Sequence, residues 1–118
     1  MLEKTVAELS KSLRSREVSS VELTRAYLER IASKNGKLNT YITICDELAI
    51  KQASKADQLI ASGNQSPMLG IPVAHKDIFC TKNIRTTCGS KMLENFVSPY
   101  DATIVSKLNK VGAVTLGK

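Results

Sequence analysis

Three short runs of β-forming residues alternate with helix-length segments, and this alternation most constrains the fold. The runs cover residues 41–44, a stretch that begins near Gly70 or Ile71, and residues 113–116. Pro72 has no N–H to donate to a neighbouring strand, so it should lie at a strand start or a sheet edge. Strands that alternate with helices predict an α/β fold.

Two capping boxes, in which a hydroxyl and a carboxylate each accept a backbone N–H, indicate where the first two helices begin. They are formed by Thr5 with Glu8 and by Ser19 with Glu22. The second helix is expected to stop at Asn35-Gly36. We therefore predict an N-terminal helical hairpin over residues 1–36, followed by the start of an α/β core over residues 37–118.

Two further helices are indicated downstream. Asp46 can cap the first and Gly63 can end it, while Asp101 can cap the second and Gly112 can end it. The irregular segment between them, residues 78–100, has the length of a functional loop. The residues expected to face inward are Ala49, Ala53, Ala56 and Ile60 in the first helix, and Ile104, Val105, Leu108 and Val111 in the second.

The last β-forming run is followed only by Gly117 and Lys118, so no helix is available to cover it. We expect this chain to be a truncated front part of a larger α/β protein. Its strand edges and an apolar face would then lack partners, which favours self-association or marginal stability.

The formal net charge of +6 would suit an acidic partner such as RNA. The basic residues, however, alternate with acidic ones along the helices, and aromatic residues make up only 4% of the chain. A solvated basic surface is therefore favoured over base-stacking platforms. A small basic RNA-binding or interaction module remains an alternative.

Localisation and redox state follow from what the sequence lacks. No apolar run approaches the roughly 20 residues that cross a bilayer, and the first ten residues do not match a secretory signal. We predict a cytoplasmic protein without a membrane partner. Cys45, Cys80 and Cys88 have no zinc-ligand spacing and are expected to be reduced.

Two motifs that suggest chemistry fit their surroundings poorly. Residues 112–118 match the G-x-x-x-x-G-K part of a phosphate-binding loop, but their middle is a β-run that follows a helix rather than a strand. His75 and Cys80 could form a thiolate–imidazole pair, but no third group is evident to orient the histidine.

Lys76 is the remaining candidate. A lysine at a strand end is usually a surface charge, but a lysine withdrawn from water loses its proton more readily and can act as a general base. Strand alternation places Lys76 on the face of Ala74, with His75 and Asp77 on the other face. Asp77 therefore need not hold the lysine in its charged form.

Several blocks of the chain are similar to a known family. "LGIPVAHKDIF" and "TTCGSKMLENFVSPYDATIVSKLNKVGAVTLGK" resemble the front part of amidase signature enzymes. Within that family, "TTCGSKMLENF", "SSVELTRAYLERI" and "LNTYIT" resemble the A subunits of the glutamyl-tRNA(Gln)/aspartyl-tRNA(Asn) amidotransferases. The resemblance covers essentially the whole chain.

The resemblance implies a mixed-sheet amidase signature fold and a Ser-cisSer-Lys triad, with Lys76 as its lysine. Both family serines would lie beyond Lys118, and neither Ser90 nor Ser106 has the signature context. His75 departs from the apolar residue that the family often has at its position. A base without a nucleophile implies that this chain alone is inactive.

The resemblance also implies substrates and partners. The parent enzyme would release ammonia from glutamine, and another protein of the complex would use ATP and Mg to amidate glutamate or aspartate on misacylated tRNA. The B and C subunits would be the partners, and no cofactor is expected in this chain. Another amidase signature hydrolase that acts on a free amide remains an alternative.

Overall fold

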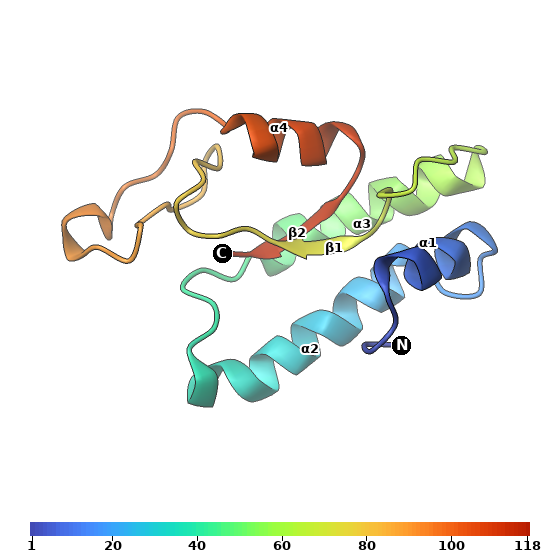
Figure 1. The fold of residues 1–118 in the computed structure, drawn as a ribbon, viewed down its shortest axis with the longest axis horizontal. Helices are drawn as coiled ribbons and strands as arrows, with labels where there is room; N and C mark the ends of the chain where they lie inside the picture. The colour runs from blue at the N-terminus through green and yellow to red at the C-terminus, as the bar shows by residue number, and fades with distance from the viewer.

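The computed structural model describes all 118 residues and confirms the α/β fold. Helices α1 and α2 lie at one side of a two-stranded parallel sheet, and α4 lies at the other (Figure 1). No helix is both long and apolar enough to cross a membrane. The elements are α1 (Val6–Arg14), α2 (Ser20–Leu38), α3 (Asp46–Ala61), β1 (Pro72–Ala74), the 3-10 helix η1 (Lys91–Leu93), α4 (Thr103–Lys110) and β2 (Val114–Gly117).

Both predicted capping boxes are present. The Thr5 hydroxyl accepts the Glu8 N–H at 3.3 Å, and the Glu8 carboxylate accepts the Thr5 N–H at 2.7 Å. Ser19 and Glu22 repeat this arrangement at 3.0 and 2.8 Å. The backbone N–H donated to each carboxylate holds the pKa of Glu8 and of Glu22 below its ordinary value, since these bonds favour the charged form.

The predicted stop of α2 at Asn35-Gly36 is wrong. The helix runs on to Leu38 and ends at Asn39, which adopts the left-handed conformation with φ 50°. The Asn35 side chain then holds Tyr41 through two hydrogen bonds of 3.1 and 2.8 Å, which fixes the exit of the chain. Gly36 is therefore an ordinary helical residue, and the division at residue 36 stays a prediction.

The predicted strand over residues 41–44 does not form. The segment makes one antiparallel bridge, from Ile44 to Gly117, and then turns into α3. Two of its N–H groups, those of Ile42 and Thr43, instead share a single acceptor, the Lys118 carbonyl, at 2.8 and 3.1 Å. β-forming side chains favour a strand here, but the segment offers only one bridge before the helix begins.

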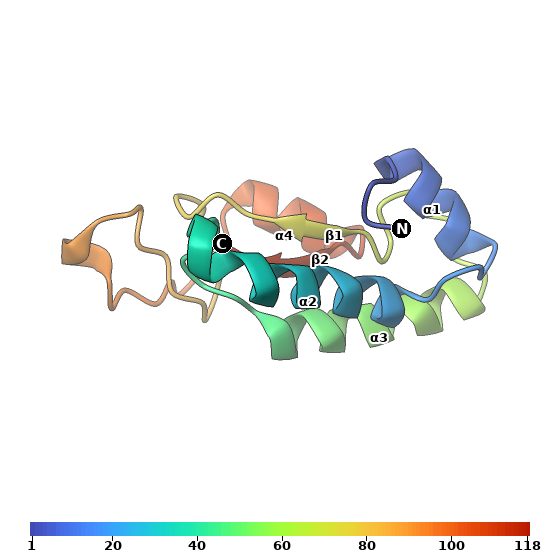
Figure 2. The same cartoon turned by 90° about the horizontal axis from the view of Figure 1, so that it is seen from below.

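Helix α3 packs on the sheet through small residues. Pro72 is the first residue of β1, and it pairs with Val114 of β2 in parallel register. All four residues of β2 are buried. The predicted α3 stripe is buried too, and its alanines let the helix lie close to the strands (Figure 2). One core cluster contains Ile31, Ala49, Ala53, Val114 and Leu116.

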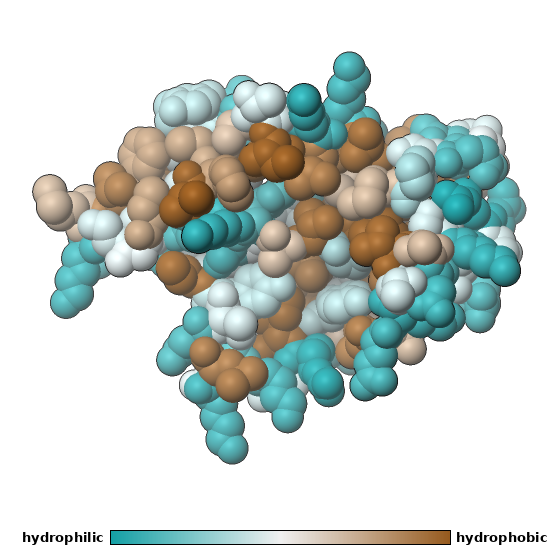
Figure 3. All heavy atoms as spheres, viewed as in Figure 1, coloured by the Kyte–Doolittle hydropathy of each residue, from teal (hydrophilic) through white to brown (hydrophobic).

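The prediction for α4 is only partly right. The N-cap of α4 is Ala102, and no side chain caps the helix. The Asp101 carboxylate, which was expected to do so, accepts the Lys82 N–H at 2.7 Å instead. Val105 is buried, but Ile104 and Val111 are 43% and 39% exposed. Apolar side chains also gather over α4 and the preceding loop in the space-filling view (Figure 3). No element of this structure covers that face, and self-association through it stays a prediction.

Gly36 and Gly117 offer a matched pair of substitutions. Gly117→Ala should lower the free energy of unfolding by about 1–3 kcal/mol, because the new Cβ would collide with the backbone carbonyl of Thr43. Gly36→Ala should raise it by about 0.5–1 kcal/mol, since this exposed helical position has open space around it. Urea unfolding measures both, and equal effects would contradict the close contact of Gly117 with the 41–44 segment.

Candidate functional site

Strand β1 leads directly into three titratable residues whose burial alternates. Ala74 and Lys76 are exposed, whereas His75 and Asp77 are 6% and 8% exposed. The predicted division between two faces is therefore confirmed. Lys76 projects outward from the sheet end, so these 118 residues do not themselves supply the desolvation that a neutral lysine needs.

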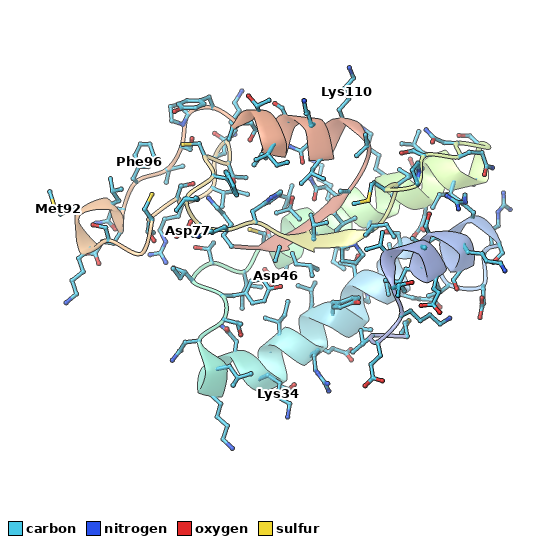
Figure 4. The ribbon with its side chains drawn as sticks, in the orientation of Figure 1. Lys34, Asp46, Asp77, Met92, Phe96 and Lys110 are labelled. Carbon is cyan, nitrogen blue, oxygen red and sulfur yellow. The ribbon has the colours of Figure 1, made fainter.

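Asp77 pairs with Lys118, which the sequence suggested only as the lysine of a poorly fitting phosphate-binding pattern. Its Oδ1 lies 3.3 Å from the Nζ of Lys118, and the Lys118 side chain is fully buried. Asp77 lies where the sheet ends and the long loop begins (Figure 4). One sequence feature could have indicated this pair: Lys118 directly follows a run of β-forming residues that is expected to be buried. The same lysine also completes the phosphate-loop pattern, so it was considered as a phosphate ligand instead.

The Lys118 ammonium is held by three oxygen atoms. Besides the Asp77 carboxylate, it donates to the Phe79 carbonyl at 2.8 Å and to the Thr86 hydroxyl. All three acceptors belong to the segment that follows Lys76. Lys118 therefore ties the end of β2 to the loop that leaves β1.

Thr87 completes the surroundings of Asp77. The Asp77 Oδ2 accepts the Thr87 N–H at 3.0 Å and its hydroxyl at 2.5 Å, while the Asp77 carbonyl accepts the Cys88 N–H at 2.8 Å. We define the polar cluster as Asp77, Thr86, Thr87 and Lys118; hydrogen bonds satisfy Asp77 Oδ2, and the Lys118 ammonium is the polar partner of Oδ1.

His75 has a structural role: its backbone N–H and its ring Nε2 both have polar partners. Its backbone N–H donates to the Gly117 carbonyl at 3.0 Å, and its Nε2 lies 3.2 Å from the Thr115 hydroxyl. Burial lowers the pKa of His75, and the nearby Lys118 charge lowers it further, while Asp101 acts in the opposite sense. The neutral imidazole is therefore the favoured form.

The stability of the chain should depend on pH through His75. An unfolded histidine binds a proton near its ordinary pKa of 6.5, whereas the folded imidazole resists protonation. The melting temperature should therefore fall as the pH is lowered from about 7.5 to about 5.5.

His75→Gln should remove most of this slope, because glutamine does not titrate. The lowered pKa values of Glu8 and Glu22 keep those carboxylates out of this pH window. Thermal melts of both proteins at several pH values make the comparison. Equal slopes would show that His75 is not the titrating group.

The other candidate groups take structural positions. Cys80 Sγ donates to the Tyr100 hydroxyl at 3.7 Å, so no His75–Cys80 pair forms. Ser90 caps η1, and Ser106 is exposed on α4. All three cysteines are free, and burial raises the pKa of Cys45. No group of three His, Cys, Asp or Glu side chains is arranged to hold a metal.

Residues 112–118 do not form a phosphate-binding loop, because they are the short turn after α4 and strand β2, with Lys118 turned inward. A surface hollow of about 850 Å³ lies along α3 between Asp46 and Gln58. It does not include Lys76, so the candidate site is the sheet end and not this hollow.

A comparison with known protein families matches the amidase family over residues 22–118. This chain belongs to the amidase family. The match includes β1, Lys76, the long loop and β2, so the whole candidate site lies within the family region of this amidase chain.

Curated relatives match the amidase chain along all or nearly all of its length. It is 54% identical over 118 residues to the A subunit of glutamyl-tRNA(Gln) amidotransferase from Coxiella burnetii (strain Dugway 5J108-111). It is 55% identical over 114 residues to the protein of the same name from Pseudomonas aeruginosa. In both comparisons the amidase chain spans 24% of the relative's length.

Solved structures show the same arrangement. The native peptide amidase from Stenotrophomonas maltophilia is 35% identical, with a TM-score of 0.90 over 98% of the amidase chain and 24% of its own. An amidase family protein from Bacillus anthracis str. Ames is 36% identical, with a TM-score of 0.89 over the same shares. The fold described above therefore corresponds to about a quarter of each of these two longer chains.

Proposed function

We propose that this chain is the front part of the glutamine-hydrolysing A subunit of a tRNA-dependent amidotransferase, and that Lys76 is its catalytic base. The similarity at 54–55% identity to curated A subunits of glutamyl-tRNA(Gln) amidotransferase carries this proposal. It extends from the first helix through the 78–100 loop to β2, and is not limited to the motif around Lys76.

The position of Lys76 supports the role of base. Its side chain leaves the sheet end on the outer face, where the rest of a longer chain could enclose it, while both neighbours in sequence are buried. Asp77 is paired with Lys118, so its carboxylate is not directed at Lys76 as a counter-ion. A lysine enclosed in this way favours its neutral form and can accept a proton.

The proposed reaction passes through an acyl-enzyme. Neutral Lys76 takes a proton, by way of the second serine, from the nucleophilic serine as its oxygen attacks the glutamine amide carbon. The C–N bond breaks, and Lys76 returns the proton to the departing nitrogen, which leaves as ammonia. Water then cleaves the ester to give glutamate and free serine. The serines belong to the part of the protein outside these 118 residues.

The ammonia would be used elsewhere in a complex. We propose that B and C subunits associate with this protein, and that one of them uses ATP and Mg to activate glutamate or aspartate on misacylated tRNA. The 118-residue chain has Lys76 but neither serine, so it should not hydrolyse glutamine by itself.

The second candidate is a hydrolase that acts on a different amide. Its support is the TM-score of 0.90 to a peptide amidase, a value reached at 35% identity. The sheet end around Lys76 would serve either function, because the base is the same and only the amide differs. Ammonia release from glutamine and from a peptide amide separates the two.

The experiment uses the full-length protein that carries this segment, with and without the co-expressed B and C subunits. We expect glutamine hydrolysis by the complex, little hydrolysis of a peptide amide, and no turnover by the 118-residue chain. Turnover by the short chain would refute the proposed triad. Peptide amide hydrolysis that is indifferent to B and C would favour the second candidate.

A further inference from the structure

The polar cluster beside the candidate base is unusual for its burial. The Lys118 side chain is fully buried, and that of Asp77 is 7% exposed. Moving two charges out of water is costly, and an apolar pair of similar volume often gives equal or greater stability. The cluster therefore needs an explanation other than stability alone.

Its geometry points to the backbone on both sides of Lys76. On one side, His75 donates its backbone N–H to the Gly117 carbonyl, one residue before Lys118. On the other side, Asp77 accepts two hydrogen bonds from Thr87 and faces the Lys118 ammonium. Lys76 is thus the single exposed residue between two anchored ones.

The same cluster sets the direction in which the chain leaves. The Lys76 carbonyl accepts the Phe79 N–H at 3.1 Å, which closes a turn, and the Phe79 carbonyl accepts from Lys118 at 2.8 Å. Lys118 therefore contacts both ends of the segment 77–79. With the turn held in this way, the Cα–Cβ direction of Lys76 is fixed relative to the sheet.

We propose that Asp77, Thr87 and Lys118 are positioning residues that hold Lys76 for proton transfer. This inference rests on the proposed function of Lys76 as the base. None of the three needs to touch the substrate, because each acts through the backbone of the residues next to Lys76. A displacement of about 1 Å at a reacting group can lower a rate by about 10²-fold.

The test measures kcat and KM for ammonia release by the full-length protein in its complex, together with unfolding by urea. Asp77→Asn keeps an acceptor for Thr87 but removes the charge that faces Lys118. Thr87→Val removes the hydroxyl that donates to Asp77, whereas Thr87→Ser keeps it. Both disruptive variants should lower kcat by about 10- to 100-fold, with KM changed by less than about threefold. Thr87→Ser should recover most of kcat.

Asp57→Asn is the matched control. Asp57 on α3 also uses its carboxylate to hold backbone groups, accepting the Ser20 and Val21 N–H groups at 2.6 and 3.1 Å. It should cost stability while leaving kcat near the wild-type value. A purely structural role, shared by carboxylates that accept backbone N–H groups, would instead lower kcat equally in both aspartate variants.

Folded Asp77→Asn and Thr87→Val enzymes with wild-type kcat would overturn the inference, and so would equal losses in Asp57→Asn. If Asp77→Asn does not fold, Thr87→Val and its serine rescue decide alone. The failure of the proposed function can be distinguished from this outcome. An active Lys76→Ala enzyme would refute the role of Lys76 as the base, whatever the Asp77 and Thr87 variants show.

Discussion

Lys76→Ala in the full-length protein should lower kcat for glutamine hydrolysis by about 10²- to 10⁴-fold, the usual contribution of a positioned acid–base group. KM should change little, because the base acts in the transition state more than in substrate binding. Lys76→Arg should be nearly as inactive, since a guanidinium does not give up its proton at neutral pH. Steady-state ammonia release measures all three enzymes.

Lys82→Ala is the control for Lys76. Lys82 is also an exposed lysine at the start of the same loop, and only its backbone N–H makes a hydrogen bond, to Asp101. Its replacement should leave kcat within about twofold of the wild-type value, because substitution of a solvated surface lysine usually has little effect. Equal losses in both alanine variants would indicate a general effect of loop charge and contradict a specific base.

Lys118→Met should be the most destabilising single change in the site, at about 3–5 kcal/mol, because it leaves the buried Asp77 charge unpaired. Asp77 Oδ1 has no hydrogen bond, so the Lys118 ammonium at 3.3 Å is its one close polar partner. The double variant Asp77→Asn with Lys118→Met should recover much of the loss, since it removes both charges. Urea unfolding of the 118-residue chain measures these differences.

Lys4→Met provides the surface comparison. Lys4 and Glu17 form the other ion pair of the structure, at 3.9 Å, with side chains 40% and 67% exposed. Water screens such a pair, so its loss should cost less than about 1 kcal/mol. A cost for Lys118→Met as small as that for Lys4→Met would mean that the sheet end is open to water.

Local patterns were sufficient for the starts of α1 and α2 and for the alternating burial of the residues that follow β1. The capping boxes of Thr5 and Ser19 depend on contacts within three residues, so they could be identified without the rest of the fold. The exposure of Lys76 between two buried neighbours follows from the alternation of an extended chain. The family was also identifiable from contiguous motifs around Lys76 and in the 78–100 loop.

The wrong predictions concern segments whose structure depends on contacts with residues far away in the sequence. Residues 41–44 have strand composition, but the N–H groups of Ile42 and Thr43 are taken by the carbonyl of Lys118, far along the chain. Ile104 and Val111 have helical apolar spacing, yet no element of this structure packs on them. Asp101 could cap α4 by its position, but the Lys82 N–H occupies its carboxylate.

Short-range spacing and side-chain chemistry were enough to predict the α/β class, the capping boxes of α1 and α2, the family and the lysine that the family motif singles out. Only the tertiary structure showed that Lys118, which directly follows β2, pairs with Asp77 in the segment that follows β1. Parallel pairing of β1 and β2 brings these residues together across a separation of 41 positions. No local pattern encodes that meeting, because it arises from sheet register and not from sequence neighbours.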